Sequence, residues 1–73
     1  MKMEWRQSDS YRDKWYLWDN PWARIHASVS TIDRDKIEVA TPKGFRVIFV
    51  PPRLTFEERK ALAEAHYAML NGE

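Results

Sequence analysis

The segment from residue 35 to residue 52, DKIEVATPKGFRVIFVPP, constrains the fold more than any other part of the chain. Its turn at 41–44, TPKG, combines a proline, which presets φ for a type I turn, with a glycine that accepts a left-handed backbone. Strand-forming residues lie on both sides of the turn, and the two prolines at 51–52 end the second strand because proline has no N–H for a sheet ladder. This segment therefore predicts an antiparallel β-hairpin.

We expect a three-residue loop closed by a glycine bulge at Gly44, because that turn suits the proline and the glycine together. Val39 then faces Val47, one side of the hairpin carries an unbroken apolar ladder, and the side with Arg46 points outward. A register shifted by one residue sets Val39 against Arg46 and loses this match. The expected core face consists of Ile37, Val39, Phe45, Val47 and Phe49.

The C-terminal segment predicts one amphipathic helix over residues 55–71. Thr55 and Glu58 have the spacing of a capping box, and the Asn-Gly pair at 71–72 suits a left-handed helix end. Arg59 falls near the middle of the apolar stripe; it either extends to solvent or lines a groove between helix and sheet, ready for a carboxylate or a peptide carbonyl. The helix is expected to cover the core face of the hairpin.

Residues 14–50, which include the hairpin, predict an antiparallel β-meander of three to four strands, with turns at 19–21 and 33–35. Residues 1–13 are polar except for Trp5 and Tyr11, and we predict an irregular aromatic arm there. The two aromatics either fold back onto the domain or serve as anchors for a partner. The expected fold class is α+β, with a single domain over residues 1–73.

Composition limits the classes of function. The 73 residues include no cysteine, and no apolar run reaches the length of a membrane span or of the centre of a signal peptide. His26 lies on the expected wet side of a strand and His66 on the apolar side of the helix, without a metal-binding spacing. No nucleophile elbow or phosphate-binding loop is present. We expect a cytoplasmic, non-enzymatic protein without metal or cofactor.

The charge pattern leaves nucleic-acid binding as an alternative. The net charge is only +1, but residues 23–53 carry six basic against three acidic side chains. This basic excess is modest and interrupted, whereas a nonspecific nucleic-acid site needs a concentrated basic stripe.

A third hypothesis is that the chain is a structural or assembly component of a virion.

Protein binding is the leading hypothesis, because tryptophan, tyrosine and arginine are enriched at interface hot spots and the first third of the chain is rich in aromatic residues. Alternation over 15–18 points Trp15 and Tyr16 to opposite sides of a strand, so one helix cannot bury all the aromatics. The aromatics on the outer side are then either exposed or covered by the N-terminal arm. The edge at 48–50 also suits addition of a partner's extended segment. The predicted partner-binding residues are Trp5, Tyr11, Tyr16, Trp18, Arg24, Arg46, Arg53 and Arg59.

From residues 1–22 through the hairpin at 41–52 to the helical segment at 54–70, the chain resembles a small bacteriophage regulator of transcription in its size and organisation. Regulators of this kind bind bacterial RNA polymerase, inhibit initiation at host promoters and act as antiterminators. The resemblance implies contact with the large polymerase subunits, particularly the amino-terminal segment of β′, interference with the sigma factor, and a location in the host bacterial cytoplasm.

Overall fold

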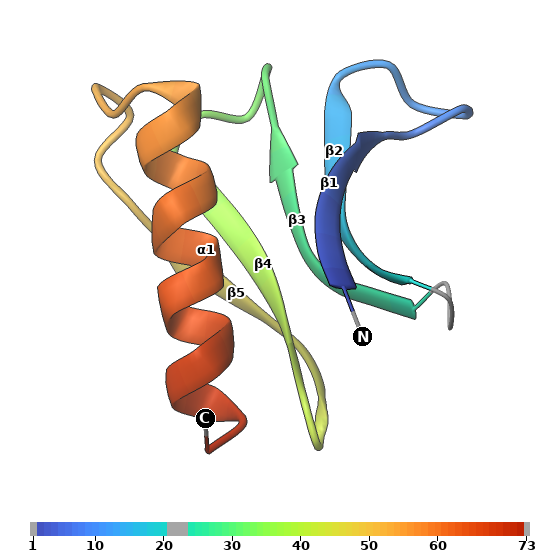
Figure 1. The fold of residues 1–73 in the computed structure, drawn as a ribbon. Coiled ribbons are helices and arrows are strands. Elements are labelled where there is room, and N and C mark those ends of the chain that lie inside the picture. Colours follow the sequence, from blue (N-terminus) through green and yellow to red (C-terminus); the bar gives the residue numbers. More distant parts are fainter. Residues whose placement is uncertain (1, 21–23, 73) are drawn as a thin grey trace.

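A computed structural model describes residues 2–20 and 24–72 of the chain. The strands form one antiparallel sheet in the order β1-β2-β3-β4-β5, so each is paired with its neighbours in the sequence (Figure 1). The one helix of the described residues, α1, lies over β3 and β4, and β1 and β2 extend beyond it (Figure 1). The α+β meander with a C-terminal helix is confirmed, with five strands in place of three or four. The elements are β1 Lys2–Gln7, β2 Lys14–Asn20, β3 Arg24–Ser30, β4 Lys36–Thr41, β5 Gly44–Phe49 and α1 Phe56–Leu70.

The additional strand is β1, so the prediction of an irregular arm over 1–13 is wrong for residues 2–7, whereas residues 8–13 form an irregular connection as predicted. Residues 2–7 pair with β2 along their whole length. Charged residues at 2, 4 and 6 alternate with Met3 and Trp5, a period-two pattern that was the available signal for a strand. Trp5 contacts the helix, and its Nε1 donates a hydrogen bond to Glu64 Oε1 at 2.7 Å. Part of the predicted turn at 19–21 lies outside the described residues, as does the aromatic residue Trp22 that follows it.

The β4–β5 hairpin adopts the register shifted by one residue from the predicted one. Thr41 pairs with Gly44 across a two-residue connection, and Val39 pairs with Arg46. The Thr41 hydroxyl donates to the Gly44 carbonyl at 2.6 Å and accepts from the Lys43 N–H at 3.1 Å, so side-chain hydrogen bonds stabilise the tighter turn. Gly44 has φ of 113°, a backbone conformation that other residues rarely adopt.

This register changes which side chains of β5 face the helix. We call the face covered by α1 the helix side and the opposite face, over which no described helix or strand packs, the open side. Ile37 and Val39 lie on the helix side as predicted, together with Ile48. The core assignment is wrong for three residues that lie on the open side, namely Phe45, Val47 and Phe49.

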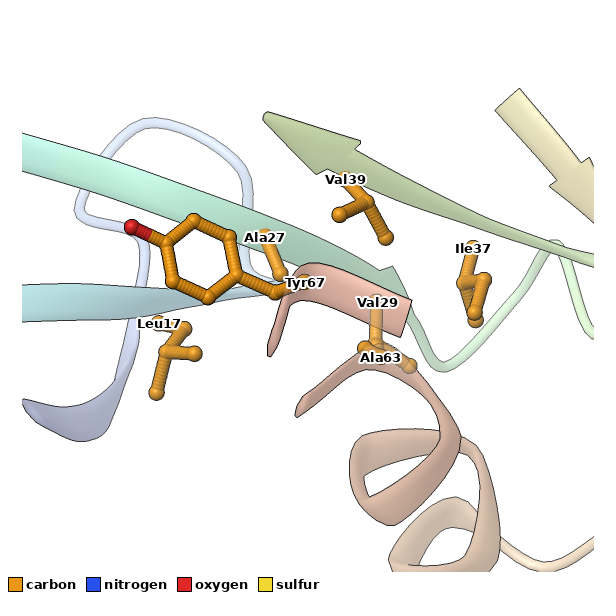
Figure 2. Close-up of a cluster of buried hydrophobic side chains, with 7 residues drawn as sticks. All are labelled: Leu17, Ala27, Val29, Ile37, Val39, Ala63 and Tyr67. Atoms are coloured by element: carbon orange, nitrogen blue, oxygen red, sulfur yellow. The ribbon is translucent and has the colours of Figure 1, made fainter. Parts of the chain in front are cut away.

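The core lies between α1 and the middle strands of the sheet (Figure 2). Leu17, Ala27 and Val39 form a row across β2, β3 and β4, because each is the register partner of the next. Ala63 is fully buried, and its small side chain lets the helix approach the sheet closely. The buried apolar residues are Leu17, Ala27, Val29, Ile37, Val39, Ala63 and Tyr67.

Both ends of α1 have the predicted caps. Glu58 N–H donates to the Thr55 hydroxyl at 3.1 Å, and Thr55 N–H donates to Glu58 Oε1 at 2.9 Å, which confirms the capping box. At the other end Asn71 is the C-cap and Gly72 has φ of 75°. Asn71 Nδ2 donates to the Ala40 carbonyl at 2.9 Å, which fastens the end of the helix to β4.

Strand β3 is buried on both sides, whereas the alternation at 25–30 predicted one wet side. A register shift between Leu17 and Trp18 places one additional residue in β3 and turns His26 to the helix side, where its ring lies 4.7 Å from the Tyr67 ring. Ser28 is buried on the open side between its cross-strand neighbours in β2 and β4. The solvent-facing assignment of His26 is therefore wrong. No helix within the described ranges is long and apolar enough to cross a membrane.

Candidate protein-binding surface

The open side of β5 carries the largest group of exposed apolar side chains on one element. Phe45 is 56% exposed, Val47 45% and Phe49 77%. They alternate along the strand, so all three point to the same side of the sheet. β5 is also an edge strand, and no described strand pairs with its free edge. We call these three residues, with the free edge of the strand, the β5 surface.

The helix side of β5 continues this surface as a shallow depression. It is lined by Arg46, Ile48, His66, Met69 and Leu70 together with Val47, and has a volume of about 270 Å³. Met69 is 65% exposed there. A second, larger depression of about 520 Å³ lies between the hairpin turn and Leu70, and Arg46 lines it too. Apolar groups therefore flank the edge of β5 on both sides of the sheet.

Arg46 is exposed, but it does not lie on the outward face predicted for it. Its register partner is Val39, so the guanidinium extends along the helix side of the sheet. Lys36, in contrast, pairs with Phe49 and belongs to the open side. Among the described residues Arg46 has no ion-pair partner, and β5 itself contains no acidic residue. An unpaired positive charge therefore adjoins the apolar side chains of the β5 surface.

Tyr16 and Trp18 lie on the open side of β2, where the sequence predicted exposed aromatics. Tyr16 is the register partner of Arg6 and Ser28, and Trp18 of Glu4 and Ile25. Both aromatic side chains are half-buried by these neighbours. Ser28 and Glu38 lie between Tyr16 and Val47 across the sheet, so the aromatics of β2 do not join the β5 surface.

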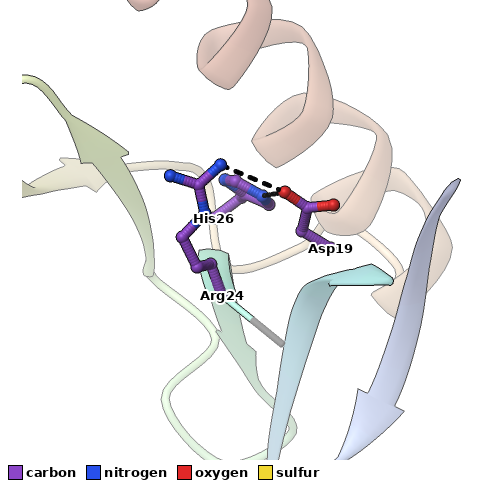
Figure 3. Close-up of polar contacts among 3 residues, drawn as sticks. All are labelled: Asp19, Arg24 and His26. Carbon is purple, nitrogen blue, oxygen red and sulfur yellow. Dashed lines mark hydrogen bonds and ion pairs between the residues drawn. The ribbon is translucent and has the colours of Figure 1, made fainter. Parts of the chain in front are cut away.

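Arg24 belongs to a polar cluster at the start of β3 (Figure 3). The fully buried Asp19 carboxylate lies between the two basic side chains, with Oδ2 3.4 Å from Arg24 Nη2 and 3.2 Å from His26 Nε2. The Arg24 side chain remains 68% exposed. Arg24 thus reaches the buried carboxylate from the solvent side, and the contacts of Asp19 with Arg24 and His26 connect the end of β2 to the start of β3 beside the shift in register.

Arg59 does not lie at the surface, because the residue is only 2% exposed. Its Nη1 donates to the carbonyl of Ser30 and, at 3.4 Å, to that of Asp33, so the guanidinium fastens the β3–β4 connection to α1. Burial, with a smaller contribution from the nearby Arg34 charge, lowers the pKa of Arg59. The sequence predicted that Arg59 either extends to solvent or lines an open groove. Instead, its guanidinium donates to backbone carbonyls inside the protein.

The remaining predicted residues are dispersed over the molecule. Trp5 is half-buried and bonded to α1, whereas Tyr11 is 58% exposed in the β1–β2 connection, with Lys14 Nζ 5.3 Å from its ring centre. Arg53 is exposed between β5 and α1. The structure therefore gathers the predicted residues into no single site. Of them only Arg46 adjoins the β5 surface, whose apolar members were missed because the predicted register placed them in the core.

Within residues 2–20 and 24–72, no group of three histidine, aspartate or glutamate side chains is placed to hold a metal ion. Comparisons with protein-family models, with curated proteins and with solved structures find no match for this chain. The geometry of the chain's own residues is therefore the basis of any functional conclusion.

Proposed function

We propose that this chain is a small non-enzymatic protein-binding module that docks through the β5 surface. The observation that carries the proposal is the exposure of Phe45, Val47 and Phe49 side by side on an uncovered edge strand. Large apolar side chains gathered on one exposed strand mark interaction surfaces more often than scattered ones do. The flanking depression beside Met69 supplies further apolar area for a partner.

The partner that we propose is bacterial RNA polymerase, through its large subunits and particularly the amino-terminal segment of β′. This choice rests on the resemblance to small phage regulators in size and organisation. Binding there would inhibit initiation and modulate termination in the host cytoplasm. A chain of 73 residues acts in this role by occupying a surface that the sigma factor or another part of the enzyme needs, without chemistry of its own.

The experiment measures association of the purified chain with purified core RNA polymerase and holoenzyme, alongside promoter-dependent transcription. We expect saturable binding and reduced initiation with the unaltered chain. The double variant Phe45→Ser, Phe49→Ser should bind at least tenfold more weakly, whereas Arg6→Ala on the opposite edge of the sheet is the matched control and should bind normally. No association at micromolar protein, or equal binding by the double variant, would contradict the proposal.

Nucleic acid remains the alternative ligand. Two of the basic residues in 23–53, Lys36 and Arg46, lie on opposite sides of the sheet, which favours protein binding over a continuous basic stripe. The two ligands differ in their response to salt, because neutralised phosphates release counterions. Affinity for duplex or single-stranded DNA that falls steeply with rising salt would favour nucleic acid, and weak, salt-independent binding would exclude it.

A further inference from the structure

The hydrogen-bonding direction of the β5 backbone identifies which groups are free at the edge. Val50 N–H donates to the Asp35 carbonyl at 2.8 Å, so the backbone groups of residue 50 point toward β4. Along an antiparallel strand this direction alternates from one residue to the next. The N–H and C=O groups of Phe45, Val47 and Phe49 therefore point away from β4, toward the free edge.

The same three residues supply both the free backbone groups and the exposed apolar side chains of β5. An added strand would satisfy the backbone groups and cover the side chains in one step. Proteins usually protect an edge strand with a proline, a bulge or charged residues on the edge. β5 contains neither proline nor a register irregularity, and Arg46 is its only charged residue.

The charge around β5 defines the chemistry of the added strand. Lys36 and Lys43 flank the strand, Arg46 lies within it, and Glu38 is the one acidic residue in β4 and β5. A second copy of this chain fits poorly, because pairing two β5 strands about Val47 makes their Arg46 side chains diagonal neighbours without a carboxylate. A strand with an acidic residue opposite Arg46 is complementary.

We propose that the β5 edge takes an extended segment of the protein partner as a sixth, antiparallel strand. Its side chains opposite Phe45, Val47 and Phe49 are apolar, and the side chain opposite Arg46 is acidic. The residue opposite Ile48 faces the depression beside Met69 and is small or apolar. This inference rests on the proposed protein-binding function, but it does not depend on which protein is the partner.

The first test titrates a synthetic peptide with the pattern Val-Thr-Val-Glu-Val into isotope-labelled protein and follows the backbone amides by NMR. We expect the largest shifts, and slower hydrogen exchange, at the amides of residues 45, 47 and 49. The matched peptide with lysine in place of glutamate should bind roughly three- to tenfold more weakly, the range expected for exposed charge pairs. In the variant Arg46→Glu the preference between the two peptides should reverse.

The second test changes the backbone of β5 without removing a hydrogen bond to β4. Val47→Pro deletes one outward N–H and should abolish the shifts. Val47→Ala also loses the valine side chain but keeps that N–H, so it should bind the peptide more weakly and still shift the amides of residues 45, 47 and 49. Circular dichroism checks that both variants fold. If Val47→Pro does not fold, the reversal of charge preference in Arg46→Glu still decides.

Shifts at other residues, the absence of peptide binding, equal affinity for both peptides, or dimers that form through β5 would each overturn the inference. Its failure is distinguishable from failure of the proposed function. RNA polymerase binding that survives in Val47→Pro and is indifferent to the charge at residue 46 leaves protein binding standing and removes strand addition. Peptide binding at β5 without polymerase binding would support strand addition and exclude RNA polymerase as the partner.

Discussion

The two edge strands of the sheet, β1 and β5, have similar free backbones but different side chains. On the open side of β1, Glu4 and Arg6 form an ion pair at 2.8 Å. On the open side of β5, Phe45 and Phe49 are more than half exposed. Charged side chains on an edge discourage pairing with another chain, and apolar ones permit it. The exposure at β5 is therefore not a general property of edges in this fold.

The two edges also differ in how they are connected to the helix. Trp5 in β1 donates a hydrogen bond to Glu64, across 59 positions of sequence. β5 reaches α1 through the short connection at 50–55, and its open side has no contact with the helix. One edge thus contributes to the fold through a distant contact, and the other leaves its apolar groups available for binding.

The largest expected difference is in stability. Leu17 in β2, directly beside β1, is 2% exposed, and Leu17→Ala should lower the free energy of unfolding by about 2–5 kcal/mol because it leaves a cavity. Phe49 is 77% exposed, and Phe49→Ala should change it by no more than about 0.5 kcal/mol. Urea unfolding of both variants measures this. Similar losses for the two would mean that β5 is part of the core.

The connection between β1 and α1 can be tested with Trp5→Phe, which keeps an aromatic ring and removes the Nε1 donor. The hydrogen bond to Glu64 is exposed, so the expected loss is about 0.5–1.5 kcal/mol. Combining this change with Glu64→Ala in a double-mutant cycle isolates the pair, and the double variant should lose less stability than the sum of the two single variants. Fully additive losses would show that the bond contributes nothing to stability.

The contrast between the edges can be removed by replacing Glu4 and Arg6 with valine. This double variant gives β1 an apolar open side like that of β5, and its free energy of unfolding should change by no more than about 0.5 kcal/mol. Its solubility should fall, because a second unprotected edge permits pairing between molecules. Sedimentation at rising protein concentration measures the loss of solubility. Val47→Lys, which places a charge on β5, is the reciprocal variant and should be more soluble than the parent. A double variant as soluble as the parent would remove the role assigned to the ion pair.

The smallest expected effect is on how stability depends on pH, through Glu58 at the start of α1. The Thr55 backbone N–H, then the Thr55 hydroxyl and more weakly the Arg53 charge, lower the pKa of Glu58 below its ordinary value of 4.5. The stabilisation from ionised Glu58 is therefore complete above about pH 4.5 and is lost as the pH falls through the lowered pKa. Glu58→Gln should flatten this acid limb in thermal unfolding, and an unchanged limb would contradict the assignment.

The helix was predictable because its signals are local. The capping box at 55–58 and the Asn-Gly pair at 71–72 depend only on neighbouring residues, and both are present in the structure. The five-strand count and the β5 surface depend on pairing between segments. A one-residue change in the hairpin turn moved Phe49 from the expected core to the open side, since side chains alternate with a period of two.

Arg59 and His26 illustrate a second limit. The sequence marked Arg59 as unusual on an apolar stripe, but only the folded β3–β4 connection supplies the carbonyls that it binds. His26 turned to the helix side because of an irregularity between two strands, which neither strand reveals alone. Residues whose partners come from another element are therefore the ones that sequence patterns place least well.

The hydrogen bond between Trp5 and Glu64 has a consequence for the order of folding. Hairpins of the meander join near neighbours in sequence, so they close short loops, whereas this bond closes a loop of 59 positions and carries a larger entropic cost. It is expected to form late, after α1 has docked on β3 and β4. Trp5 is therefore expected to be among the last residues to reach its partner, and its fluorescence is a signal for completion of the fold.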